Sequence, residues 1–126
     1  MATAVSKMMD PEGIGDTIYK VTDIENVLTV LEIDACELVS IEWTGQVNEI
    51  CYLKFYNDVN ATVGTTAPVC QIPVDNTAVT FSGYFRTPVS DVFTAGLAIA
   101  CTTEAGTAGT TNPTAAVNCN ITVRAA

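Results

Sequence analysis

The side chains that most often carry out catalysis are scarce in this chain of 126 residues. It contains no histidine, so it cannot assemble a Ser-His-Asp triad, a Cys-His pair or an imidazole-based metal site. Two carboxylates could still act together on a glycosidic bond, and the candidates are Glu37, Glu42 and Glu49. These glutamates fall beside strand ends and on outward faces, where solubilising charges are typical. We therefore predict that the chain is not an enzyme and has no catalytic residues.

The five cysteines are odd in number and include no CxxC pair, so their spacing indicates no metal site. Three of them, Cys51, Cys101 and Cys119, occupy apolar positions in segments that alternate apolar and polar residues. A thiol at such a position behaves as a small core hydrophobe. We expect buried thiols rather than redox-active or nucleophilic ones.

Acidic residues dominate the charge, with fourteen carboxylates against five bases and a net charge of −9. This balance repels phosphate backbones, and no stripe of basic and aromatic residues is present, so we predict no nucleic-acid binding. Oxygen ligands for calcium could come from Asp16, Asp23, Glu25 and Asp34, but the D-x-[DN]-x-[DN]-G spacing is missing. We predict no metal and no cofactor.

No apolar run approaches the roughly 20 residues that cross a bilayer, so we predict no membrane span. The first residues, MATAVSKMMDPEGIGD, lack a basic start followed by a long apolar core. We therefore expect no secretory signal, and synthesis in a cytoplasm.

Apolar and polar residues alternate along most of the chain, which is typical of half-buried β-strands. The segments with this pattern are 27–33, 36–43, 51–56, 69–72, 79–81, 97–101 and 117–124. Short strands separated by turn residues predict an all-β fold, an antiparallel β-sandwich that is jelly-roll-like. Two alternatives stay open: a helix over 24–33, and a small barrel in place of the sandwich.

The alternation also predicts which side chains face the core. Trp43 closes one apolar face, which favours a core position over a sugar-stacking platform. Two stretches do not alternate: 82–95 is expected to be irregular, and 102–116 to be a mobile or partner-stabilised loop. The residues expected to point inward are Val39, Ile41, Trp43, Cys51, Leu53, Phe55, Leu97, Ile99, Cys101, Val117, Cys119, Ile121 and Val123.

Residues 1–24 show no sustained period, which predicts an irregular N-terminal arm and leaves 25–126 as the β-sandwich domain. Apolar side chains on such an arm could bind a partner and order on binding. The candidates are Met8, Met9, Ile14, Ile18 and Tyr19. The alternative is an ordinary edge strand that packs on its own domain. Two small residues, Ala98 and Ala100, share a face and suggest close approach of another layer or subunit.

Several motifs resemble small all-β structural proteins of tailed bacteriophages. They are YLKFYN, VGTTAPV and QIPV between Tyr52 and Val74, followed by FSGYF and GLAIACTTEAGT. In that family a strand ending in "KLYN" leads through "TVGTDTPV" to "IPV". The resemblance covers roughly Ala35 to Val123 and rests on turn spacing and strand composition.

The resemblance implies a capsid decoration, or cement, protein on the outside of a phage head. The implied partner is the major capsid protein, and the implied assembly is a homo-oligomer, with a trimer favoured and with Ala98 and Ala100 in the subunit interface. A neck, tail or fibre-associated virion component is the first alternative. The second is a carbohydrate-binding module, in which stacking residues would be Tyr52, Tyr56, Tyr84 and Phe85.

Overall fold

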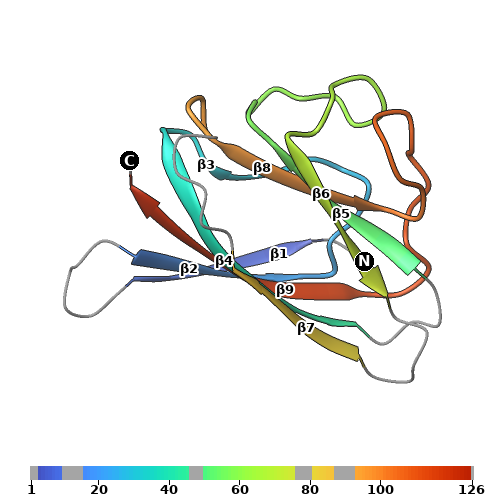
Figure 1. The fold of residues 1–126 in the computed structure, drawn as a ribbon, viewed down its shortest axis with the longest axis horizontal. Helices are drawn as coiled ribbons and strands as arrows, with labels where there is room; N and C mark the ends of the chain where they lie inside the picture. Colours follow the sequence, from blue (N-terminus) through green and yellow to red (C-terminus); the bar gives the residue numbers. More distant parts are fainter. Residues whose placement is uncertain (1–2, 10–15, 46–49, 76–80, 87–92, 126) are drawn as a thin grey trace.

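The computed structural model describes residues 3–9, 16–45, 50–75, 81–86 and 93–125, and these residues form β-strands and no helix. The strands make two sheets, and every pairing between neighbouring strands is antiparallel. Figure 1 shows the two sheets as two layers, one above the other. The predicted antiparallel β-sandwich is therefore confirmed, and the chain forms two separate sheets rather than a single closed barrel.

The strand order within each sheet interleaves distant parts of the chain. The five-stranded sheet runs β1 (Ala4–Met9), β2 (Asp16–Thr22), β9 (Val117–Ala125), β4 (Cys36–Gly45) and β7 (Phe81–Arg86). The four-stranded sheet runs β3 (Thr29–Glu32), β8 (Leu97–Thr102), β5 (Ile50–Tyr56) and β6 (Cys70–Asp75). Pro73 lies in the edge strand β6, as expected for a residue that cannot donate to a ladder.

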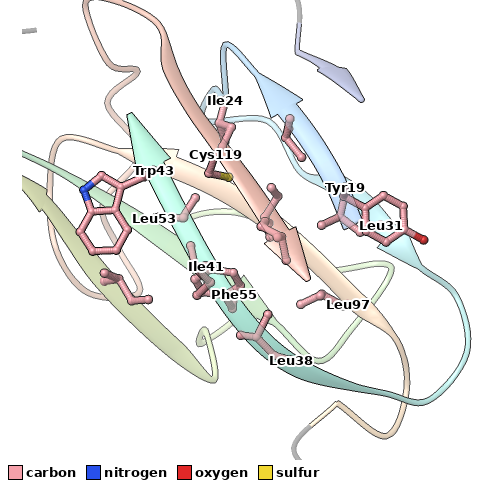
Figure 2. Close-up of a cluster of buried hydrophobic side chains, with 14 of the residues drawn as sticks. Tyr19, Ile24, Leu31, Leu38, Ile41, Trp43, Leu53, Phe55, Leu97 and Cys119 are labelled. Atoms are coloured by element: carbon pink, nitrogen blue, oxygen red, sulfur yellow. The ribbon is translucent and has the colours of Figure 1, made fainter. Parts of the chain in front are cut away.

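The core lies between the two sheets and is built by the inward half of each alternating strand. Cys51, Leu53 and Phe55 of β5 are fully buried there, as are Val117 and Ile121 of β9. Figure 2 shows side chains from β2, β4, β5, β8 and β9 meeting in this layer, with Trp43 at one side and Tyr19 at the other. The inward faces predicted for β5, β8 and β9 are confirmed.

One inward face was predicted out of register, because β4 contains a bulge. Its pairing with β9 shifts between Leu38 and Ser40, so Val39 is an extra residue on the bulged strand. Leu38 is buried and Val39 is only half-buried, whereas Ile41 and Trp43 beyond the bulge point inward as predicted. An insertion of one residue reverses the alternation, and the sequence carries no mark of it.

Two predicted boundaries are also wrong. The strand expected over 27–33 covers only Thr29–Glu32, and both Val27 and Ile33 are exposed. The stretch 82–95, expected to be irregular, begins with strand β7, which pairs with β4. Both strands are sheet edges with a single neighbour, where the hydrophobic pattern is weakest.

Within the predicted irregular arm, residues 1–24, the described residues are largely strand, namely Ala4–Met9 and Asp16–Thr22. β1 and β2 pair antiparallel, and β2 also pairs with β9 inside the five-stranded sheet. Tyr19 and Val21 are buried in the core, so residues 16–22 belong to the sandwich itself. The buried residues of β2 do alternate with less buried ones, at Thr17, Tyr19 and Val21. This alternation is too short to be recognised next to a segment that contains Met and Gly.

Candidate binding face

Each sheet has an outer face turned away from the core, and the two outer faces are built differently. On the four-stranded sheet, the outward residues Lys54, Tyr56 and Ala98 are fully buried. On the five-stranded sheet, the outward residues Lys20 and Glu42 are exposed. The first face is covered by the chain's own loops, and the second is open to solvent.

The cover over the four-stranded sheet consists of loops 57–69 and 103–116. Ala61 and Val63, from the first loop, join Tyr56 in a small apolar cluster that is separate from the main core. The two loops also touch each other: a Cβ added at Gly64 would lie 2.6 Å from a methyl group of Thr110. Gly64 has φ +97°, so both its backbone and its surroundings require glycine.

Lys54 fastens the second loop to the sheet. Its side chain is fully buried, and Nζ donates to the carbonyl oxygens of Gly106 at 2.6 Å and Gly109 at 3.1 Å. Burial lowers the pKa of the Lys54 ammonium, and the nearby carboxylate of Glu104 acts in the opposite direction. The two carbonyls supply the hydrogen bonds that a buried charge needs, which identifies Lys54 as a structural residue.

Glu104 stabilises the same loop through hydrogen bonds to other residues of that loop. Its Oε1 accepts from the backbone N–H groups of Thr110 (3.0 Å) and Thr111 (2.7 Å), and its Oε2 accepts from the Thr111 hydroxyl (2.5 Å). These hydrogen bonds lower the pKa of the Glu104 carboxyl, because they favour its charged form. The prediction of a loop that is mobile or held by a partner is therefore wrong: the chain's own polar groups hold it.

Ala98 and Ala100 were predicted at a subunit interface, and this prediction is wrong in the structure. Both residues are fully buried beneath the loops, in the cluster that contains Tyr56. The small side chains do allow close approach of another layer, but that layer is the chain's own loop. A second copy cannot reach them while the loop is in place.

The outer face of the five-stranded sheet carries a hollow of about 300 Å³. It lies over β2, β9 and β4, which are neighbouring strands. The register places Lys20 opposite Asn120, and Asn120 opposite Glu42, so these three side chains form one row across the face. The residues that line the hollow are Lys20, Val21, Thr22, Glu42, Asn118, Cys119 and Asn120.

The shape of this hollow follows from side-chain length. Asn118, Asn120 and Thr22 have short side chains, whereas the longer Lys20 and Glu42 lie on the two sides of Asn120 in the register. Val21 and Cys119 contribute little beyond their backbone, because their side chains are buried on the core side of the sheet. The accessible lining therefore combines these polar groups with a comparable share of apolar surface.

Of the residues predicted as partner contacts, the structure describes the side chains of Ile18 and Tyr19, which lie on opposite faces of β2. Ile18 is exposed, whereas Tyr19 is buried in the core and its hydroxyl donates to Glu32 Oε1 at 2.5 Å. The ammonium of Lys7 lies 5.7 Å from the centre of the Tyr19 ring. Tyr19 thus packs within its own domain, which contradicts its predicted role as a partner contact. The backbones of Met8 and Met9 lie in β1, but their side chains and all of Ile14 fall outside what the structure describes.

Of the four aromatic residues proposed to stack on sugars, the structure describes the side chains of two, Tyr52 and Tyr56. Tyr56 is fully buried and Tyr52 is half-buried. The side chains of Tyr84 and Phe85 fall outside the described part of the structure. A carbohydrate platform that includes Tyr56 is therefore excluded by its burial.

The residues weighed for catalysis and metal binding form no metal site in the part of the chain that the structure describes. Glu42 is exposed and Glu37 half-buried, while Glu49 lies outside the described residues. Among the described residues, no group of three His, Cys, Asp or Glu side chains could hold a metal ion. Asp16 instead pairs with Arg124 at 2.9 Å, which holds the pKa of its carboxyl below the ordinary value.

Four of the five cysteines are buried, as predicted for Cys51, Cys101 and Cys119. Burial raises the pKa of Cys36 to about 11 and also raises the pKa of Cys119. A thiol with a raised pKa holds little thiolate near neutral pH, which agrees with a packing role.

Comparison with protein-family models, with curated proteins and with solved structures found no match to this chain. Across the described ranges, the structure contains no helix long and apolar enough to pass through a membrane.

Sequence reasoning missed the hollow, although parts of its lining were visible. The alternation over 117–124 identified Asn118 and Asn120 as the polar side of a strand. Nothing in the sequence indicated that this strand lies between β2 and β4, so its partners Lys20 and Glu42 could not be assigned. A pairing between residues about 100 positions apart is decided by tertiary structure.

Proposed function

We propose that this protein is a non-enzymatic virion structural protein that decorates the outside of a tailed-phage head and stabilises it. The motifs between Tyr52 and Thr107 resemble that family, as described above. The proposed partner is the major capsid protein, and the proposed assembly is a homo-oligomer on the shell.

The strand order is the observation that carries this proposal. From β2 to β9, four strands lie in each sheet, as β2-β9-β4-β7 and β3-β8-β5-β6. Consecutive strands lie in opposite sheets, apart from the neighbouring pair β5 and β6. This order supports a jelly roll, an architecture that recurs in viral capsid proteins and also in lectins. A fold alone does not define a function, so the role depends on the surface that remains free.

The open five-stranded face and the edge strand β1 are the surfaces available for a capsid contact. β1 has one hydrogen-bonded neighbour, β2, so one of its edges is unpaired within the sheet. The exposed apolar residues Val5 and Ile18 lie on β1 and β2. The acidic excess of the chain would keep it away from packaged DNA, which agrees with a position outside the shell.

The copy number of the protein in purified virions tests the proposal. Quantitative mass spectrometry against the major shell protein should give a ratio of the same order as one copy per shell subunit. A handful of copies per particle would instead favour the neck, tail or fibre-associated alternative. Absence from the particles would refute both virion roles.

A further inference from the structure

We propose that the hollow over β2, β9 and β4 is a binding site for a neutral saccharide. This inference goes beyond the capsid role and does not depend on it, because it rests on the lining of the hollow alone. It differs from the aromatic platform weighed from the sequence, since the groups that would bind the sugar are amides, a hydroxyl, an ammonium and a carboxylate.

The lining offers both donors and acceptors within one small area. Each asparagine amide can donate and accept, and so can the hydroxyl of Thr22. Lys20 can only donate and Glu42, when ionised, can only accept. A sugar hydroxyl both donates and accepts, so a ring with several hydroxyls can satisfy this mixed set. An apolar ligand would leave the same groups without partners.

The charges in the hollow balance each other. Lys20 and Glu42 stand on opposite sides of Asn120, and the structure records no ion pair between them. The row therefore contains one ammonium and one carboxylate on opposite sides of Asn120, and together they favour neither an anion nor a cation. A neutral ligand is therefore the one for which both charged groups can make hydrogen bonds without repulsion.

Two features of the hollow hold its polar groups in position before a ligand arrives. All seven lining residues lie on paired strands, which fix a site more rigidly than a loop does. The Oδ1 atom of Asn118 accepts from the backbone N–H of Asp23 at 2.9 Å. That hydrogen bond orients the amide, so its nitrogen is left to donate to a ligand.

Side-chain amide signals of Asn118 and Asn120 in two-dimensional ¹H–¹⁵N NMR spectra provide the test. The probes are maltotriose, cellotriose, mannotriose and chitotriose, each titrated to about 20 mM because single small sites often bind in the millimolar range. We expect at least one probe to shift both amide signals with saturation. The spectrum of each variant also reports whether it is folded.

Variants then locate the site. Asn120→Ala and Glu42→Gln should each raise Kd by roughly fivefold to tenfold, the effect of one lost hydrogen bond. Thr122→Ala is the matched control: this residue lies on the same strand and the same face as Asn120, two positions along and outside the hollow. Its substitution should leave Kd unchanged.

Three results would overturn the proposal. In the first, no probe shifts the Asn118 and Asn120 signals. In the second, the shift of the Asn118 signal persists unchanged in Asn120→Ala. In the third, sodium acetate, ammonium chloride or triglycine at the same concentration produces shifts as large as the best saccharide, which would identify an ion or peptide site instead. Virion copy number is measured independently, so failure here leaves the capsid proposal to its own test.

Discussion

The two outer faces of this sandwich come from the same kind of strand but have opposite environments. Lys54 and Lys20 are both lysines at outward positions in alternating strands, yet Lys54 is fully buried and Lys20 is exposed. The difference lies in the loops, because 57–69 and 103–116 fold over the four-stranded sheet. An outward position in a strand is therefore not the same as a solvated one.

Small residues also have different effects on the covered face and on the open face. Ala98 and Ala100 leave room on the sheet, and the apolar cluster around Tyr56 fills it. On the open face, short Asn118 and Asn120 also leave room, but no segment described by the structure fills it, and a hollow results. The protein itself fills the space on the covered face, and the space on the open face is available to a ligand.

Truncation of the covered aromatic residue should have the largest effect. Tyr56→Ala removes a fully buried ring from beneath the loops and should lower the free energy of unfolding by about 3–5 kcal/mol, measured by urea denaturation. Tyr56→Phe keeps the ring and removes a buried hydroxyl that has no hydrogen-bond partner among the described residues, so it should cost less than about 1 kcal/mol. Equal losses in both variants would contradict this view of the cluster.

Alanine substitution of the two lysines compares the faces directly. Lys54→Ala leaves the carbonyls of Gly106 and Gly109 without their donor and opens a cavity, so we expect a loss of about 3 kcal/mol. Lys20→Ala on the open face should change the free energy of unfolding by less than about 0.5 kcal/mol. If the two variants were equally stable in urea denaturation, the loop cover would not depend on Lys54.

Acid should loosen the covering loop before it affects the open face. The folded-state pKa of Glu104 lies below the ordinary value of 4.5, so its contribution to stability is fully present above that pH. It is lost as the pH falls through the depressed folded-state pKa, when the carboxylate is protonated. The protection of the Thr110 and Thr111 amides against hydrogen exchange, relative to an unfolded chain at the same pH, should decrease over this range. Glu104→Gln should exchange faster at neutral pH and lose most of the pH dependence.

The surface ion pair between Asp16 and Arg124 should have the smallest effect. It lies on the open side, where both side chains are solvated, and such pairs contribute little and are screened by salt. Arg124→Ala should produce a slight decrease in melting temperature at low salt and none at about 1 M NaCl, where screening is nearly complete. If Arg124→Ala lowered the melting temperature as much as Lys54→Ala does, the open face would contribute more to stability than a solvated surface can.

The sequence by itself determined the fold class and most of the core. Alternation in β5, β8 and β9 identified the inward residues, because a strand with one buried face must place apolar side chains at every second position. Pro73 lies in an edge strand for the equally local reason that it lacks an N–H. Strand type and inward face depend on neighbouring residues, so a single sequence contains them.

Tertiary structure alone decided the register, the outer faces and the hollow. The bulge at Val39 reversed a predicted face, and the pairing of β2 with β9 turned a predicted arm into part of the sheet. Burial of Lys54 and Ala98 depends on loops that are distant in sequence, and the hollow requires three strands from different parts of the chain. These features arise from contacts between remote residues, which no local pattern of side chains encodes.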